Sequence, residues 1–278
     1  MIHIVGFSGG IDSQACALWV RNHFPDDRII LLNSNAGGNE SPITEAFVAE
    51  YSEKIFPVIR VDAIYADLWK TEHFAETKGY DSNAPLSFGD MIKVKGRAPS
   101  RTRQFCTHVL KLIPQRRWCD ENIHEEYERY TGVRRDESAK RANTPFREWD
   151  EFFDCYVNRP LADWSKKMCF EYVTSHGEEY NPLYKLGFGR VGCAPCINSG
   201  KDDILLWYQR FPEMIDKIRD YERESGRTFF APMVPGLAMN TIDQVIEWAT
   251  TGRGGRQHDF IRIHEERPAC ESKYGLCE

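Results

Sequence analysis

The chain has 278 residues, of which 41% are hydrophobic and 13% aromatic, and this composition excludes a disordered protein. The formal net charge of −6 argues against non-specific attraction to nucleic acid over the whole surface. No apolar run reaches the roughly 18 residues of a membrane span, so we expect no membrane-embedded segment.

Strands and helices are predicted to alternate over about the first ninety residues. Ile2–Phe7 reads as a buried strand that follows the initial Met directly, which leaves no room for a secretory signal and predicts a cytoplasmic protein. Further strands are expected at 28–32 and 57–61, with helices at 11–19 and from Pro42 to about 51. Such alternation predicts a mostly parallel sheet with right-handed crossovers.

The remaining two thirds of the chain is predicted to be less regular at first and then mainly helical. In order, the pattern predicts a mobile loop within 63–103, a helix at 106–126, strands at 130–135 and 152–157, a helix capped by Asp163 and ended by Gly177, a cysteine-bearing turn, and helices at 201–223 and 241–250. We therefore expect an α/β domain at 1–165, an open sheet with helices on both faces, and a helical, cysteine-bearing extension at 166–278.

The stretch 6-GFSGGIDSQA-15 lies between the first predicted strand and helix. Backbone N–H groups converge on a phosphate only where no Cβ obstructs them, and a helix start adds free donors and a positive dipole. Ser8 and Ser13 supply further hydroxyl donors around Gly9 and Gly10. The stretch predicts a phosphate-binding loop, although an ordinary capped turn is the alternative. It matches neither the Walker form nor the dinucleotide-binding form of such loops.

Nine cysteines in a protein without an export signal favour metal ligands or reactive thiols over disulfides. Cys193 and Cys196 form a C-x-x-C pair in 191-VGCAPCINSGK-201, and Cys106 is a third candidate ligand. The fourth ligand is open among Cys119, Cys270 and Cys277. The residues alone leave an iron–sulfur cluster, zinc and unliganded thiols as alternatives, with a redox pair as a weaker one.

A basic run extends from Lys93 to Arg117 and carries eight lysines and arginines without a single acid. Such a run is typical of a solvated helix face. Because Cys106 lies in its middle, an anion site is the sharper hypothesis.

The loop sequence SGGxDS resembles that of the PP-loop ATP pyrophosphatases, which hold the β- and γ-phosphates and release pyrophosphate. Other segments resemble, in the same order, the phosphoadenosine phosphosulfate (PAPS) reductase family, near its DNA phosphorothioation sulfur-transfer branch. They are 33-NSNAGGNESPITEAFV-48, 106-CTHVLKLIP-114, 131-TGVRRDESAKRA-142, 159-RPLADW-164 and 181-NPLYKLGFGRVGCAPC-196. The resemblance covers nearly the whole chain and implies an adenine nucleotide alpha hydrolase-like fold.

The resemblance also implies roles for individual residues. By this resemblance, the nucleotide is bound by Ser8, Gly9, Gly10, Asp12, Ser13, Gly37 and Arg135. The catalytic residues are Asp12, Lys111, Arg134 and Cys277. Asp12 would position Mg²⁺, with Glu40 and Glu137 nearby. A [4Fe–4S] cluster would be held by Cys106, Cys193, Cys196 and Cys277. Phe105 stands where the family has the first cysteine of a Cys-Cys pair.

Two reactions fit this resemblance. In one, ATP adenylates a substrate, pyrophosphate leaves and a sulfur species displaces AMP; a cysteine desulfurase would donate sulfur, and nucleic acid is a candidate acceptor. In the other, a tail thiolate, Cys277 or Cys270, attacks the sulfur of APS or PAPS and thioredoxin later reduces the product. The intact Gly-Gly and Asp-Ser positions favour ATP, because many reductases have lost them. A non-catalytic nucleotide-binding subunit is the third alternative.

Overall fold

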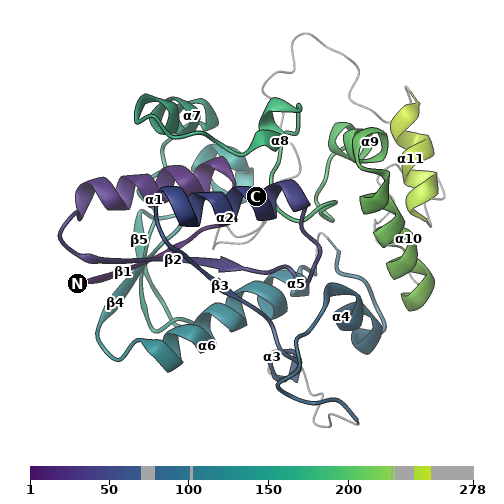
Figure 1. Ribbon diagram of the computed structural model, residues 1–278, viewed down its shortest axis with the longest axis horizontal. Coiled ribbons are helices and arrows are strands. Elements are labelled where there is room, and N and C mark those ends of the chain that lie inside the picture. The colour runs from purple at the N-terminus through teal and green to yellow at the C-terminus, as the bar shows by residue number, and fades with distance from the viewer. Residues whose placement is uncertain (70–78, 101–102, 227, 229–240, 252–278) are drawn as a thin grey trace.

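The computed structural model describes residues 1–69, 79–100, 103–226, 228 and 241–251. Its centre is a six-stranded sheet in the order β3-β2-β1-β4-β6-β5 (Figure 1). All neighbouring strands are parallel except β5 and β6, which are antiparallel. The strands are β1 (Ile2–Gly6), β2 (Arg28–Ser34), β3 (Val58–Val61), β4 (Tyr127–Tyr130), β5 (Arg147–Asp150) and β6 (Cys155–Asn158).

Helices cover both faces of this sheet. Figure 1 shows α1 (Ile11–His23), α2 (Pro42–Lys54) and α7 (Lys166–Ser175) on one face and α6 (Ile113–Asn122) on the other. Alternating side chains of β1 explain this: Val5 packs in the core under α1 and α2, whereas Ile4 packs in the core under α6.

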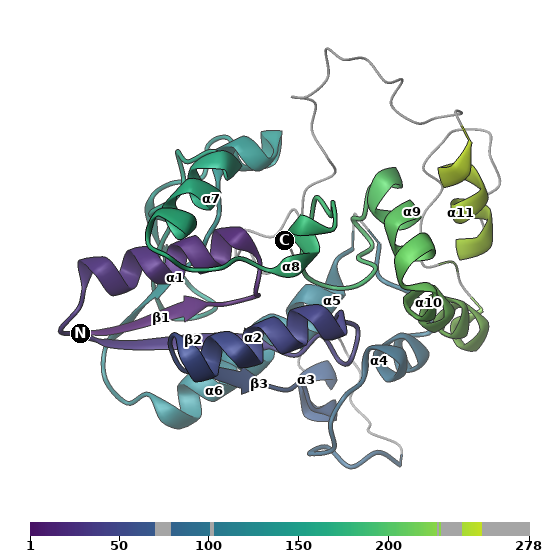
Figure 2. The same cartoon turned by 45° about the horizontal axis from the view of Figure 1, so that its top comes forward.

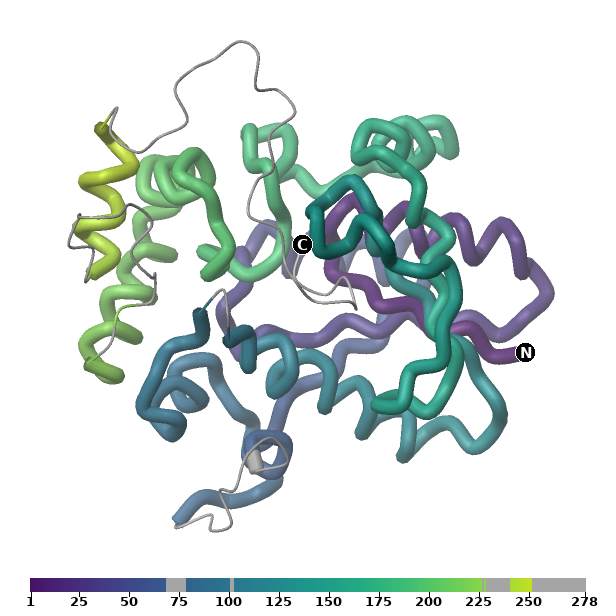
Figure 3. The backbone as a smooth tube through the Cα atoms, turned by 180° about the vertical axis from the view of Figure 1, so that it is seen from behind, coloured from purple at the N-terminus to yellow at the C-terminus, as the bar shows by residue number. Residues whose placement is uncertain are grey.

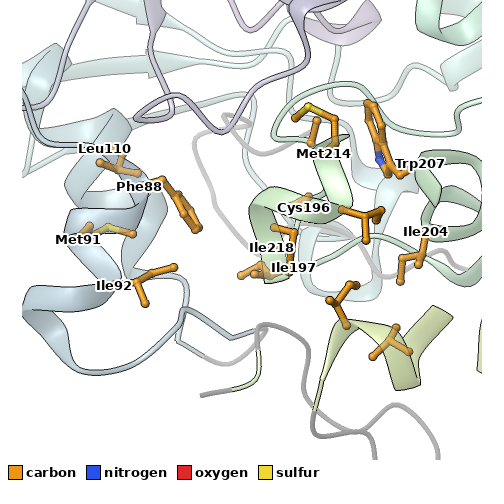
Figure 4. Packing of buried hydrophobic residues seen from close by; sticks show 14 of the residues in the cluster. Phe88, Met91, Ile92, Leu110, Cys196, Ile197, Ile204, Trp207, Met214 and Ile218 are labelled. Carbon is orange, nitrogen blue, oxygen red and sulfur yellow. The ribbon is translucent and has the colours of Figure 1, made fainter. Parts of the chain in front are cut away.

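A second hydrophobic core lies beside the sheet. It joins α4 (Phe88–Lys95) to α9 (Lys201–Arg210), α10 (Pro212–Ser225) and α11 (Ile242–Thr250), which stand beyond α8 (Pro182–Lys185) in Figure 2. Seen from behind, these helices lie at the end of the molecule opposite the N-terminus (Figure 3). Figure 4 shows Phe88 and Met91 of α4 on one side of this core, and Cys196 and Ile197 of the cysteine-bearing turn on the other.

The structure confirms the predicted fold class and corrects several elements. The strand expected at 130–135 is wrong, because β4 is Tyr127–Tyr130 and residues 131–134 belong to no strand. The helix expected at 201–223 is two helices, since Pro212 begins a new one after Phe211. Ser165, and not Asp163, accepts the capping hydrogen bond of α7.

Within 63–103, predicted as a mobile loop, the described residues form α3 (Tyr65–Trp69) and α4. β5 was not predicted, and β6 begins at Cys155, three residues later than expected. The helix expected at 106–126 is composite: α5 (Phe105–Thr107), a π-helical turn η1 (His108–Leu112) and α6. Short 3₁₀ turns, η2 (Arg135–Glu137) and η3 (Ala139–Arg141), follow β4.

None of the helices in the described ranges has the length and apolarity to cross a membrane. The division into units at residue 165 stays a prediction.

Candidate functional site

The strand order reverses between β1 and β4. The chain proceeds from β1 through β2 to β3 on one side, then returns to β4 on the other side of β1. In open α/β sheets, ligands bind beyond the carboxyl ends of the strands at such a reversal. The loops after β1 and β4 are therefore where a ligand is expected, and both carry residues that the sequence singled out.

The loop between β1 and α1 is held in shape by its own side chains. Ser8 Oγ and Ser13 Oγ lie 3.0 Å apart, and Ser13 Oγ also accepts the backbone N–H of Ser8 at 3.1 Å. Gly9 has φ +82°, and a Cβ there would come within 2.9 Å of Val48 Cγ2 on α2. Glycine is needed at this position both for its backbone conformation and for space.

Asp12 and Arg134 form a buried ion pair between the two loops. Arg134 Nε lies 2.9 Å from Asp12 Oδ2, and both side chains are 5% exposed. Burial opposes the charge of Arg134, but Asp12 and Asp136 outweigh that effect and raise the pKa of the guanidinium. Asp12 Oδ1, in contrast, is buried and has no hydrogen-bond partner among the described residues.

Gly132 explains how the two loops come so close. A Cβ at this residue would lie 2.4 Å from the carbonyl oxygen of Asp12 and 3.0 Å from the backbone nitrogen of Ser13. The loop after β4 thus packs directly on the first turn of α1, which brings Arg134 to Asp12.

Lys111 is positioned by the π-helical turn η1. Ile113 donates its backbone N–H to the carbonyl of His108, five residues earlier. Pro114 has no N–H for the carbonyl of Leu110, which accounts for the departure from α-helical bonding. In an α-helix, residues five apart point about 140° away from each other. With the π turn, Cys106 and Lys111 line the same cavity.

The cysteine-bearing turn is bonded to the loop after β2. Ala194 donates its N–H to the carbonyl of Asn39 at 3.0 Å, and Glu40 and Cys193 form an antiparallel bridge. Glu40 is buried, which raises the pKa of its carboxyl, and the charge of Lys111 opposes that rise. The charge of Lys111 therefore acts on Glu40, which is bridged to the cysteine-bearing turn.

Three thiols line one small cavity of about 20 Å³: those of Cys106, Cys193 and Cys196. Burial, reinforced by repulsion from the other two thiols, raises the pKa of Cys106 to about 12. Burial likewise raises the pKa of Cys193 to about 11, although Lys111 opposes the rise. Metal uptake here must displace thiol protons. Across the described ranges, no three metal-binding side chains lie close enough to share a single ion.

Several predicted site residues lie elsewhere or face other groups. Arg135 pairs with Asp163 and stacks on the Phe146 ring, 4.3 Å from its centroid. Glycine at position 37 is explained by packing, since a Cβ would lie 2.4 Å from the Phe88 backbone nitrogen. The nucleotide roles of Gly37 and Arg135 remain predictions.

Cys119 is a buried residue of α6, where Arg129 Nη1 lies 3.9 Å from its sulfur, and it does not line the cavity of the other three thiols. The structure therefore does not bring Cys119 together with them. Cys270 and Cys277 lie outside the described residues. Glu137 pairs with Arg141.

Several described members of the basic run contact different groups. Arg116 pairs with Asp120, and Arg117 pairs with Asp67. Lys95 and Arg97 both lie over the ring of Phe105. Of the remaining members, Lys111 is buried beside the thiols, and Arg101 lies outside the described residues.

Sequence reasoning missed two side chains that support the loop between β1 and α1. Tyr184 accepts the backbone N–H of Ile11 at 3.0 Å through its hydroxyl, and Asn181 Nδ2 donates to the carbonyl of Gly9 at 3.3 Å. The Asn-Pro pair at 181–182 signals the start of α8. Nothing in the sequence shows that this helix reaches the loop.

Comparison with known proteins shows the family to which the chain is similar. The family model described as "Phosphoadenosine phosphosulfate reductase domain" matches residues 2–199. An uncharacterized 37.8 kDa protein of Escherichia phage 186 is 31% identical, over 100% of this chain and 97% of its own. An adenosine 5′-phosphosulfate reductase of Streptomyces coelicolor is 52% identical over 56% of this chain and 69% of that enzyme.

A second adenosine 5′-phosphosulfate reductase, from Allochromatium vinosum, is 38% identical, and the match spans 48% of this chain and half of that enzyme. Among solved structures, the phosphoadenylyl-sulfate reductase of Candida auris in its phosphate complex aligns with a TM-score of 0.47 at 15% identity. That alignment covers 70% of this chain and 82% of the other.

Proposed function

The chain belongs to the phosphoadenosine phosphosulfate reductase domain family, and from this we propose that it is a PP-loop enzyme that binds ATP and releases pyrophosphate. The observation that carries the proposal is Asp12. One carboxylate oxygen faces Arg134, and the other is buried without a partner among the described residues, at the start of α1. A carboxylate oxygen of this kind is a ligand that Mg²⁺ accepts alongside substrate phosphates.

In this proposal the loop residues Ser8, Gly9, Gly10 and Ser13 hold the β- and γ-phosphates through backbone N–H groups and hydroxyls. An oxygen of the substrate attacks the α-phosphorus, the bond to the bridging oxygen breaks, and pyrophosphate leaves. The guanidinium of Arg134 offsets the charge that develops on the phosphates, because it is held at the loop by Asp12. A sulfur species then displaces AMP from the adenylated substrate.

We further propose that the thiols of Cys106, Cys193 and Cys196 hold a [4Fe–4S] cluster, with Cys277 as fourth ligand. Cysteine thiols are the ligands that an iron–sulfur cluster takes, and three of them line one cavity beside the cation of Lys111. In such a cluster each thiolate ligates a different iron, so the sulfurs need not converge on one point as they would for zinc. The cluster would supply electron transfer or a sulfur-binding iron.

Protein purified without oxygen should be brown, absorb near about 400 nm and contain about four irons per chain. Cys193→Ser should lose most of the iron, because serine replaces one thiolate ligand. Cys169→Ser is the matched control, since Cys169 is a buried cysteine of α7 that forms no disulfide and packs in another core. Iron content and absorbance measure both, and a colourless, zinc-loaded wild type would rule the cluster out.

A second candidate function is sulfonucleotide reduction, which the names of the Streptomyces and Allochromatium relatives favour. In that reaction a tail thiolate, Cys277 or Cys270, attacks the sulfur of APS or PAPS. The two functions separate when the protein is incubated with ATP and, in parallel, with APS or PAPS. We expect pyrophosphate from ATP. Sulfite without ATP turnover would establish the reductase, and binding without turnover of either would indicate a non-catalytic subunit.

The proposed chemistry also defines partners and surroundings. In the ATP-using reaction, a cysteine desulfurase would supply the sulfur, and nucleic acid is the candidate sulfur acceptor. In the sulfonucleotide reduction, thioredoxin would reduce the enzyme. None of the seven described cysteines forms a disulfide, which suits the reducing cytoplasm.

A further inference from the structure

Asn198 is a buried amide at the thiol-lined cavity. It follows the C-x-x-C pair by two residues, is 2% exposed and lines the cavity together with Cys106, Cys193 and Cys196. Its side-chain Nδ2 is buried and has no hydrogen-bond partner among the described residues. Buried polar groups are normally hydrogen-bonded, so a group that accepts its hydrogen is expected in the cavity.

The backbone around Asn198 is already arranged to donate to sulfur. The N–H of Asn198 points at Cys196 Sγ, 3.4 Å away. Ser199 fixes this turn, because its Oγ accepts the N–H of Cys196 at 3.1 Å and its own N–H bonds the Cys196 carbonyl at 2.8 Å. Asn198 therefore offers two donors at the cavity: a backbone N–H that Cys196 Sγ accepts, and a side-chain Nδ2 without a partner among the described residues.

We propose that Asn198 Nδ2 donates a hydrogen bond to a sulfur of the cofactor held by these thiols and thereby raises its reduction potential. This inference rests on the proposed iron–sulfur cofactor. Reduction adds negative charge to the sulfurs, so a donor stabilises the reduced form more than the oxidised form. Asn198 is a tuning residue in this role, and it takes no part in ligation.

The test is a dithionite titration of the anaerobically purified full chain, followed by absorbance and electron paramagnetic resonance. Asn198→Ala should favour the oxidised form by about tenfold, which equals a midpoint potential lower by about 59 mV for one electron. Asn198→Asp, which is similar in size but cannot donate when ionised, should lower the potential further. Both variants should retain the iron content of the wild type.

Asn158→Ala is the matched control, because Asn158 on β6 donates to Glu128 at 2.8 Å and does not line the cavity. Its potential should equal that of the wild type. Iron-replete Asn198 variants with an unchanged potential would overturn the tuning role and leave the proposed cofactor standing. A wild type without iron would remove the cofactor and, with it, this inference.

Discussion

Replacing Asp12 by asparagine should lower the rate of pyrophosphate release from ATP by about 10³-fold. The substitution keeps the size of the side chain, but it removes the charge that pairs with Arg134 and that would bind the proposed Mg²⁺. Metal-assisted charge stabilisation is worth several kcal/mol, and each tenfold in rate corresponds to about 1.36 kcal/mol. Initial rates of pyrophosphate formation at saturating ATP and Mg²⁺ measure the effect.

Asp136→Asn separates this role from a general effect on Arg134. Asp136 contacts the same guanidinium, but its side chain is 48% exposed and it lies outside the phosphate-binding loop. We expect the rate of this variant to stay within about threefold of the wild type, because exposed ion pairs contribute little. If Asp12→Asn were as active as Asp136→Asn, Asp12 would have no part in binding the metal or the phosphates.

Local sequence signals were sufficient for β1, β2 and α2. β1 and β2 are rich in apolar residues, and Pro42 begins α2 directly after the Ser41 cap, so each signal lies within a few residues of its effect. β5 was not predicted because three of its four residues are charged. Edge strands of this composition carry no hydrophobic periodicity.

The candidate site depends on both local motifs and long-range contacts. The Gly-Gly and C-x-x-C motifs are local and were recognised as candidates. That Gly132 packs on Asp12, and that Asn39 binds the cysteine-bearing turn, depends on contacts between segments more than a hundred residues apart. The π turn lies between these two cases. Pro114 was visible in the sequence, but a proline predicts a helix kink or a helix end more often than a hydrogen bond to the residue five positions earlier.

Gly132→Ala should weaken nucleotide binding on the order of 10²-fold and lower the melting temperature by several degrees. Gly132 does not have a positive φ, so alanine is allowed by its backbone conformation, and the obstacle is the carbonyl of Asp12 at 2.4 Å. The loops must separate to admit the methyl group, at a cost of about 1–3 kcal/mol in stability. Separation moves Arg134 from Asp12, and misplacement by about 1 Å costs roughly 10²-fold in catalytic sites.

Gly177→Ala provides the comparison, because Gly177 follows α7 with φ +76° and open space around it. Its left-handed conformation makes alanine cost about 1 kcal/mol without moving either loop. We therefore expect both variants to melt earlier, but only Gly132→Ala to bind ATP more weakly by calorimetry. Equal affinities in the two variants would mean that contact between the β1 and β4 loops is not needed to hold the nucleotide, and the site would then have to be sought in the β1 loop alone.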